Sequence, residues 1–305
     1  MSHLKKYHGI IPAFYACYDA DGEISPQAVR DLTQYFIDKG VQGLYVNGSS
    51  GECIYQSVED RKIVLENVMA VAKGKLTIIA HVACNSSKES QILAAHAESL
   101  GVDAIAAIPS IYFRLPEYAI ADYWNEISAA APHTDFVIYN IPQLAGVALT
   151  PSLYREMLKN ERVVGVKNSS MPVQDIQTFA SIAGPEKIVF NGPDEQFLAG
   201  RLMGAAGGIG GTYGAMPELF LRLNQLIEDK ELDRARELQY AINDIIAKLC
   251  SCHGHMYAVI KAVLKINEGL ELGGVRSPLS NLIATDQPAV EEAAALIRAT
   301  KETFL

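Results

Sequence analysis

Lys167 is the residue of this sequence best placed to act as a nucleophile. It ends the run Val163–Lys167, in which four residues suited to a buried β-strand precede the amine. A lysine held at the end of a buried strand loses hydration, and the neutral amine that this favours can attack a ketone. A lysine in this position can equally extend into solvent or pair with an acid. Position alone leaves both interpretations open.

Tyr139 ends the preceding predicted strand, Phe136–Tyr139, at the place that matches Lys167 one strand away. A phenol beside the amine can carry a proton between the amine adducts and a substrate hydroxyl, as aldol cleavage requires. A tyrosine is also commonly a packed core aromatic whose hydroxyl makes one hydrogen bond. The nearby Lys167 favours the proton-carrying role.

A turn of small residues, Asn47–Glu52, follows the predicted strand Gly43–Val46. Such a turn offers successive backbone N–H groups and the hydroxyls of Ser49 and Ser50, which suits a substrate carboxylate. The alternative is an ordinary turn in which glycine relieves backbone strain and serine caps the following helix.

Short β-rich runs alternate with helical patterns along the chain, which is typical of a parallel sheet built from βαβ units. The predicted strands are Gly9–Ala16, Gly43–Val46, Leu76–His81, Ala104–Ala107, Phe136–Tyr139, Val163–Lys167, Ile188–Asn191 and Gly207–Gly210. The predicted helices between and after them are Ser25–Lys39, Ser57–Ala72, Ser87–Leu100, Pro116–Ala130, Thr150–Leu158, Val173–Ala183, Asp194–Met203 and Pro217–Asp229. Eight such units predict an α/β fold, a TIM (β/α)8 barrel, whose active site forms at the C-terminal ends of the strands. A doubly wound open sheet is the second choice, but no GxGxxG opens the fold.

The β pattern ends near Leu232, and only helical stretches follow, about Leu232–Cys252, His255–Asn267 and Gln287–Thr303. No linker rich in Pro, Gly or Ser precedes them. We therefore predict a barrel over residues 1–231 and a C-terminal helical appendix over residues 232–305 that packs on the barrel.

Composition restricts the possible partners. The chain has 305 residues, 49% of them hydrophobic, and a formal net charge of -9. This charge argues against binding to nucleic acid or to an anionic membrane surface. No stretch approaches the roughly 18 apolar residues of a membrane span, and no apolar leader segment opens the sequence. We expect a cytoplasmic protein that acts on a small molecule.

The five cysteines are too few and too scattered for a disulfide framework, so we expect reduced thiols. The cluster Cys250-Ser-Cys252-His253-Gly-His255 fits no standard zinc spacing and has no second half elsewhere in the sequence. The sequence therefore predicts neither a metal nor another cofactor.

Three motifs together resemble the N-acetylneuraminate lyase / dihydrodipicolinate synthase family over most of the chain. They are Gly48-Ser49-Ser50-Gly51-Glu52, Tyr139-Asn140-Ile141-Pro142 and Gly165-Val166-Lys167. The resemblance implies a homotetrameric class I aldolase in which Lys167 forms an imine with pyruvate or a pyruvoyl group. It further implies that Ser49 and Ser50 hold the carboxylate of this 2-keto acid and that Tyr139 is the proton shuttle.

Two further segments resemble the N-acetylneuraminate lyase branch. Dihydrodipicolinate synthases carry an arginine two residues after the motif proline, but here Gln143 and Leu144 follow Pro142. The segment Asn191–Glu195 is similar to the N-G-x-D-E segment of the lyases, which implies that Gly192, Asp194 and Glu195 contribute to the sugar site and that the two acids bind its hydroxyls. Acids at the start of a helix also interact favourably with its dipole, so a structural role is equally open.

Three residues depart from the lyase pattern. Gly211 stands where the lyases have a serine near the sugar tail, and Ser169 replaces a common threonine in the substrate site. Ile111 aligns with a tyrosine that crosses to the neighbouring protomer's proton relay, for which Tyr112 is the possible substitute.

These departures leave the pyruvate chemistry intact and put the aldehyde partner in question. The leading hypothesis is reversible cleavage of N-acetylneuraminate to N-acetylmannosamine and pyruvate. A related pyruvate-dependent aldolase or hydratase-aldolase that acts on another 2-keto acid is the nearest alternative. A non-catalytic ligand-binding homologue is an alternative of a different class, although the complete set of Lys167, Tyr139, Ser49 and Ser50 argues against it.

Overall fold

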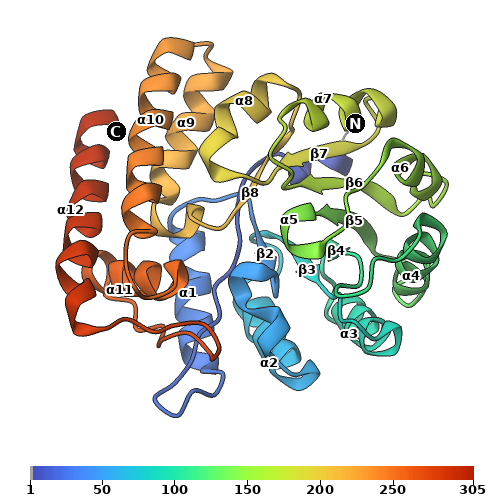
Figure 1. The fold of residues 1–305 in the computed structure, drawn as a ribbon, viewed down its shortest axis with the longest axis horizontal. Coiled ribbons are helices and arrows are strands. Elements are labelled where there is room, and N and C mark those ends of the chain that lie inside the picture. The colour runs from blue at the N-terminus through green and yellow to red at the C-terminus, as the bar shows by residue number, and fades with distance from the viewer. Residues whose placement is uncertain (1–2) are drawn as a thin grey trace.

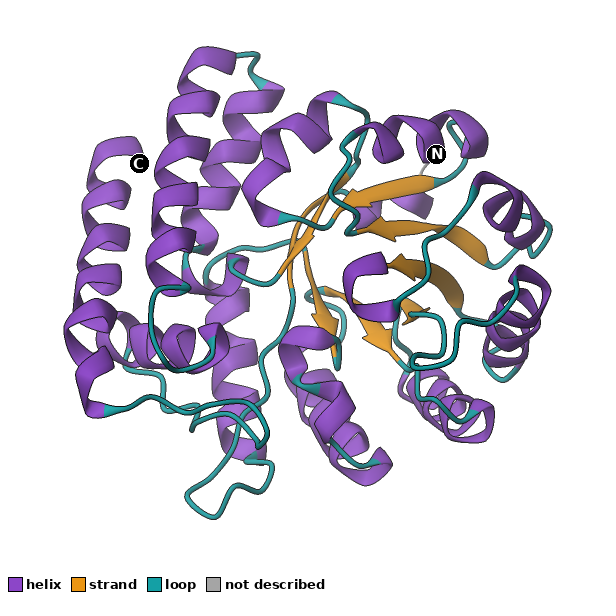
Figure 2. Ribbon diagram, in the orientation of Figure 1, coloured by secondary structure: helices purple, strands orange, loops and turns teal. Residues whose placement is uncertain are grey.

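Eight parallel strands form a barrel at the centre of the molecule, and helices surround it (Figures 1 and 2). The computed structural model describes residues 3–305. The strands are β1 (Gly9–Pro12), β2 (Gly43–Val46), β3 (Thr77–His81), β4 (Ala104–Ala107), β5 (Asp135–Asn140), β6 (Val163–Asn168), β7 (Ile188–Asn191) and β8 (Gly207–Gly210). They run in the order β1-β8-β7-β6-β5-β4-β3-β2, and a parallel bridge between Ala13 and Tyr45 joins the first strand to the second. The predicted TIM barrel is confirmed.

A helix follows each strand, as the alternating pattern predicted. These helices are α1 (Pro26–Asp38), α2 (Val58–Ala72), α3 (Ser87–Leu100), α4 (Glu117–Ala129), α5 (Pro142–Ala145), α6 (Pro151–Met157), α7 (Gln174–Ala183), α8 (Phe197–Leu202) and α9 (Pro217–Glu228). The predicted start signals are present at two of them: Ser25 accepts a hydrogen bond from the Ala28 N–H at α1, and Ser57 and Asp60 form a capping box at α2.

The structure differs from the predicted elements at three places. The first strand ends at Pro12 rather than Ala16, because Ala13 forms only an isolated bridge with Tyr45 and the pairing ends with the hydrogen bond from the Phe14 N–H to the Tyr45 carbonyl. The predicted helix Asp194–Met203 divides into a 3-10 turn, η4 (Asp194–Gln196), and α8. Sequence periodicity did not reveal α5, since it is only four residues long.

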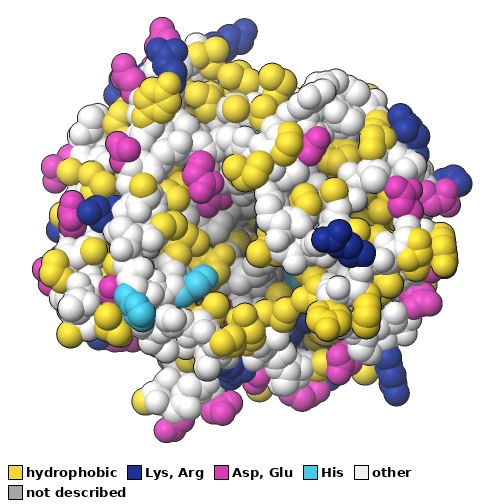
Figure 3. All heavy atoms as spheres, viewed as in Figure 1, with side chains coloured by type: hydrophobic (Ala, Val, Ile, Leu, Met, Phe, Trp, Pro, Cys, Tyr) yellow, Lys and Arg dark blue, Asp and Glu magenta, His cyan; other side chains and the backbone are white. Residues whose placement is uncertain are grey.

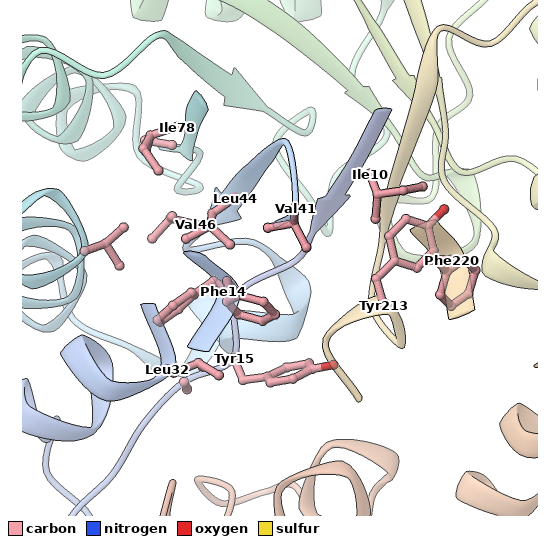
Figure 4. Close-up of a cluster of buried hydrophobic side chains, with 14 of the residues drawn as sticks. Ile10, Phe14, Tyr15, Leu32, Val41, Leu44, Val46, Ile78, Tyr213 and Phe220 are labelled. Atoms are coloured by element: carbon pink, nitrogen blue, oxygen red, sulfur yellow. The ribbon is translucent and has the colours of Figure 1, made fainter. Parts of the chain in front are cut away.

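Two layers of buried side chains hold the barrel together. The inner layer fills the space between the strands and includes Ile11, Tyr45, Val137, Tyr139 and Phe190. The outer layer lies between the strands and the helices; Figure 4 shows a part of it that joins β1 and β2 to α1, α9 and the turn around Tyr213. The side chains that point inward at the C-terminal ends of the strands are therefore held rigidly from both sides.

Three long helices follow the barrel: α10 (Leu232–Leu249), α11 (Met256–Glu268) and α12 (Gln287–Phe304). In Figure 1 they lie together beside α9 and α1, and each has an apolar face that is buried. The 3-10 turn η5 (Tyr213–Ala215), which follows β8, contacts α11. This contact brings the start of α11 to the C-terminal end of the barrel. The division of the chain into two parts at residue 231 remains a prediction.

Candidate active site

A cavity of about 270 Å³ lies at the C-terminal ends of the strands. It corresponds to the hollow near the middle of the face shown in Figure 3. Eight of the nine residues singled out from the sequence line it: Ser49, Ser50, Tyr139, Lys167, Ser169, Gly192, Asp194 and Glu195. The ninth, Tyr112, does not. A larger cavity, of about 770 Å³, lies at the other end of the barrel and contains none of these nine residues.

Lys167 and Tyr139 lie side by side at the bottom of this cavity. The two residues are partners in the register of β5 and β6, and the Lys167 Nζ lies 4.0 Å from the centroid of the Tyr139 ring. The ring of Tyr45, from β2, lies on another side of the amine, at 4.3 Å. No salt bridge to Lys167 occurs within residues 3–305, and only 5% of the residue is exposed. The amine is therefore buried among aromatic faces and has no competing carboxylate partner.

The small-residue turn after β2 forms one side of the cavity. It contains a 3-10 turn, η2 (Ser49–Gly51), and the Ser50 hydroxyl donates a hydrogen bond to the hydroxyl oxygen of Tyr257, at 2.9 Å. A Cβ atom on Gly48 would lie 2.6 Å from the Tyr45 ring, so this position requires glycine. The turn thus presents two serine hydroxyls beside Lys167.

Glu52, the last residue of this turn, has a structural role. Its φ is 56°, in the left-handed region, and its carboxylate is buried. The carboxylate accepts hydrogen bonds from the Tyr18 hydroxyl at 3.0 Å, from Lys261 Nζ at 3.0 Å and from the Arg276 N–H at 2.8 Å. Burial lowers the pKa of Lys261, while the charge of Glu52 acts in the opposite direction. This buried ion pair attaches the turn to the C-terminal helices.

Asp194 and Glu195 lie across the cavity in η4 and differ in their surroundings. Asp194 is buried, and its Oδ2 accepts hydrogen bonds from the N–H and the hydroxyl of Thr212, both at 2.6 Å. Burial raises the pKa of Asp194 to about 6, although these hydrogen bonds act in the opposite direction. Glu195 is exposed. The structure therefore brings both acids to the cavity but orients only Asp194.

Ser169 lies two residues after Lys167 and Gly192 two residues before Asp194, and both line the cavity. The Ser169 N–H donates to the Asn140 carbonyl and the Gly192 N–H donates to the Asn168 carbonyl, both at 2.8 Å. These bonds continue the ladder between β5, β6 and β7 by one residue. The side chain of Ser169 and the backbone of Gly192 therefore face the cavity from fixed positions.

Tyr112 lies away from the cavity within a single chain. It has a φ of 85° and is 88% exposed, and its ring packs edge-on against that of Phe113. Neither residue lines the cavity. A role for Tyr112 in a proton relay would therefore require a second copy of the chain.

Sequence reasoning missed two residues at this site. Tyr45, from β2, does not line the cavity but is buried inside the barrel against the Lys167 amine, and the alternation of side chains along a strand was a signal that could have placed it there. Tyr257 comes from α11, in the region predicted as an appendix, and nothing in its local sequence indicates that it reaches the barrel.

The structure also bears on metal binding and on membrane insertion. Among the residues that the structure describes, no group of three or more His, Cys, Asp or Glu side chains could hold a metal ion. In the same part of the chain, no helix is long and apolar enough to cross a membrane.

Comparison with known proteins identifies the family. The profile described as the Dihydrodipicolinate synthetase family matches residues 6–297. The chain belongs to this family. This family member is 70% identical, over 305 residues, to the N-acetylneuraminate lyase of Mediterraneibacter gnavus, with 100% of this chain and 97% of that protein covered. The resemblance drawn from the three motifs is confirmed.

Solved structures agree with this assignment. The wild-type sialic acid aldolase of Ruminococcus gnavus superposes on the family member with a TM-score of 0.98 at 71% identity, covering 98% of this chain and 100% of that chain. A catalytic lysine mutant of the Ruminococcus gnavus aldolase gives a TM-score of 0.99 at 70% identity and covers 99% of each chain.

Proposed function

We propose that this protein is a carbon–carbon lyase that reversibly cleaves N-acetylneuraminate to N-acetylmannosamine and pyruvate through an imine on Lys167. The observation that carries the proposal is the cavity itself, which is lined by two serines and by a buried amine that lies beside a tyrosine and makes no salt bridge within residues 3–305. The 70% identity to an N-acetylneuraminate lyase supports the choice of substrate.

The reaction begins at the Lys167 amine. The neutral amine attacks the C2 ketone of the open-chain substrate, and the resulting carbinolamine loses water to form a protonated imine. The faces of the Tyr139 and Tyr45 rings stabilise a nitrogen that carries positive charge, because the face of an aromatic ring carries partial negative charge. The positive imine then serves as the electron sink, so this sequence of steps requires no metal or organic cofactor.

Cleavage of the C3–C4 bond follows. The C4 hydroxyl loses its proton and becomes the aldehyde carbonyl, while the electron pair of the broken bond moves toward the imine nitrogen and leaves an enamine. Tyr139 relays the proton, accepting it on the phenolic oxygen as it passes its own proton on. Protonation of the enamine at C3 and hydrolysis of the imine release pyruvate and restore the amine.

The remaining residues bind the two ends of the substrate. Ser49 and Ser50 hold the carboxylate with neutral hydrogen-bond donors. Ser169, Gly192, Asp194 and Glu195 face the sugar tail, and the two carboxylates accept hydrogen bonds from its hydroxyls.

A homotetramer in the cytoplasm completes the proposal. The exposed rings of Tyr112 and Phe113 support burial of this segment against another copy, which would bring Tyr112 to the neighbour's proton relay. The net charge of -9 and the five scattered cysteines, none of them in a disulfide, support an intracellular small-molecule enzyme.

Borohydride trapping tests the chemistry. The protein is treated with pyruvate and borohydride, the modified peptide is located by mass spectrometry, and pyruvate release from N-acetylneuraminate is measured separately. We expect a reduced adduct on Lys167 together with release. An adduct without release would indicate a related aldolase with another aldehyde partner, and release of pyruvate from shorter 2-keto-3-deoxy acids would then identify it. No adduct would refute the imine and favour a non-catalytic binding protein.

A further inference from the structure

Tyr257 brings a hydroxyl from the C-terminal helices into the cavity. It lies near the start of α11, where its N–H donates to the His255 ring, and its own ring packs against that of Tyr15 with the centroids 6.0 Å apart. Its hydroxyl oxygen accepts the hydrogen bond from Ser50. Tyr257 therefore touches the turn to which the binding of the carboxylate is assigned.

The hydrogen-bond pattern leaves one donor free. Because Ser50 donates to the Tyr257 oxygen, the phenolic hydrogen of Tyr257 points elsewhere, and no acceptor for it is found within residues 3–305. Burial raises the pKa of Tyr257, so the phenol keeps this hydrogen. The cavity thus contains a neutral donor that no part of the described chain uses.

Gly211 provides the space for this arrangement. Its φ lies outside the left-handed region, so the backbone does not require glycine. A Cβ atom there would lie 3.2 Å from the Ser50 Oγ and 3.3 Å from the Tyr257 hydroxyl oxygen, and a serine hydroxyl would extend further into the same space. The Tyr15 hydroxyl donates to the Gly211 carbonyl at 2.7 Å and so fixes this segment. The space beside Gly211 is therefore occupied by the Ser50–Tyr257 pair.

We propose that the Tyr257 hydroxyl is a third donor to the carboxylate of the 2-keto acid, after the Ser49 hydroxyl and the backbone N–H of Ser50, and that Gly211 makes room for it. Lys167 is the only cationic side chain among the described residues that line the cavity, and its nitrogen is used in the imine. The carboxylate must therefore be held by neutral donors, and a phenol is a strong one toward an anion. The inference rests on the proposed function, because it assumes that the 2-keto acid binds at Lys167.

The variant Tyr257→Phe removes this donor and keeps the ring. A hydrogen bond to a charged group that is lost in this way corresponds to a weakening of about 10-fold or more. We expect the pyruvate concentration for half-maximal borohydride trapping on Lys167 to rise by that factor. The matched control is Tyr35→Phe, which removes a buried hydroxyl that donates to the Gly214 carbonyl at 3.2 Å outside the cavity. The control should leave the trapping curve unchanged.

The variant Gly211→Ser tests whether the Tyr257 hydroxyl needs the space beside Gly211. Alone, it should displace the Tyr257 hydroxyl and weaken pyruvate trapping. Combined with Tyr257→Phe, which frees the volume of the phenolic oxygen, the new serine hydroxyl can take the vacant place. We therefore expect the double variant to trap pyruvate at lower concentrations than either single variant. A purely structural loss at each position would make the double variant the worst of the three.

The outcomes separate this inference from the function on which it rests. If the wild-type protein forms no adduct with pyruvate, the imine itself is refuted. If wild-type protein is trapped and Tyr257→Phe is trapped at the same pyruvate concentrations, the inference is overturned and the imine stands. If the variant changes only the KM for N-acetylneuraminate, the hydroxyl serves the sugar tail and the assignment to the carboxylate is wrong.

Discussion

Two walls of the cavity hold their polar groups in opposite ways. The reaction wall is formed by Lys167 and Tyr139, with the ring of Tyr45 packed against the amine, which lies among aromatic faces and makes no salt bridge within residues 3–305. The acidic wall is formed by Asp194, Glu195 and Thr212, and there two hydrogen bonds from Thr212 already hold one oxygen of Asp194. In the reaction wall, the Lys167 nitrogen has no charged partner among the described residues. In the acidic wall, two of the hydrogen bonds that Asp194 can accept are used to orient its carboxylate.

The contrast follows from what each wall must do. A nucleophile with a strong internal partner would have to break that interaction before reacting, so aromatic packing positions it at lower cost. A carboxylate that recognises hydroxyl groups makes no covalent bond, so internal hydrogen bonds can orient it without a penalty to the chemical step. Changes to the reaction wall should therefore lower kcat, and changes to the acidic wall should raise KM.

The largest effect is expected from Lys167→Ala. Removal of the nucleophile should lower kcat on N-acetylneuraminate by on the order of 10⁴-fold or more, because no other amine lines the cavity in the described chain. Pyruvate release measures the activity, and circular dichroism checks that the variant is folded. A folded variant that kept more than a few per cent of the activity would contradict the imine mechanism.

Tyr139→Phe should have the second-largest effect. The variant keeps the ring beside the amine and removes the proton carrier, so kcat should fall by roughly 10²- to 10³-fold. Borohydride trapping of pyruvate on Lys167 should persist, because the packing around Nζ is unchanged. Equal loss of trapping and turnover would mean that Tyr139 positions the lysine rather than relaying a proton.

Asp194→Asn should act on binding and on its pH dependence. The carboxylate is charged above pH about 6 and protonated below it, so the wild-type KM for N-acetylneuraminate should rise as the pH falls through 6. The variant should show a KM raised about tenfold at pH 8 and lack this acidic rise. Pyruvate trapping on Lys167 serves as the control and should be the same in both proteins. A changed trapping curve would mean that the two walls are not independent.

The same substitution should stabilise the folded chain. The pKa of Asp194 is about 6 in the folded protein, against an ordinary value of 3.8, so the buried charge costs stability above pH 6. The wild type recovers this stability as the pH falls from 6 toward 3.8, because the folded form then binds the extra proton. We expect Asp194→Asn to raise the free energy of unfolding at pH 8 by up to about 3 kcal/mol, a gain that shrinks in acid. Urea denaturation at pH 8 and pH 4.5 measures both values.

Glu195→Gln should have the smallest effect. Its side chain is exposed, and no hydrogen bond within residues 3–305 orients its carboxylate. We expect the KM for N-acetylneuraminate to change by less than about fivefold, since a flexible exposed acceptor contributes little. A larger effect than that of Asp194→Asn would reverse the order proposed for the acidic wall.

Local sequence was sufficient for most of the barrel. The strands are short apolar runs, and the helices begin with recognisable caps such as Ser25 and Ser57. The hydrophobic patterns of strands and helices can therefore both be recognised within a short window of sequence. The end of the first strand was wrong because Tyr15 and Ala16 have a strand-like composition, but the strand pairing ends with the hydrogen bond from the Phe14 N–H to the Tyr45 carbonyl. Pairing is a tertiary property, and composition alone does not report it.

The residues of the site likewise fall into those that local sequence could place and those that depend on the tertiary structure. Lys167, Tyr139 and the serine turn could be placed together because they follow strand ends, and the C-terminal ends of barrel strands converge at one face. Tyr257 could not be placed, since it lies some 90 residues after Lys167 on a helix with no fixed relation to the strand pattern. The position of α11, which the ion pair of Glu52 with Lys261 holds against the turn, decides that its hydroxyl reaches Ser50.

The sequence by itself determined the repeated βα order, the residues at the strand ends and the family. These depend on periodicity and on short motifs, which are local. Only the tertiary structure decided that Asp194 is buried against Thr212, that Tyr45 lies beside the amine and that Tyr257 fills the space beside Gly211. Each of these is a contact between segments distant in the chain, and its energy depends on burial and distance, which exist only once the chain is folded.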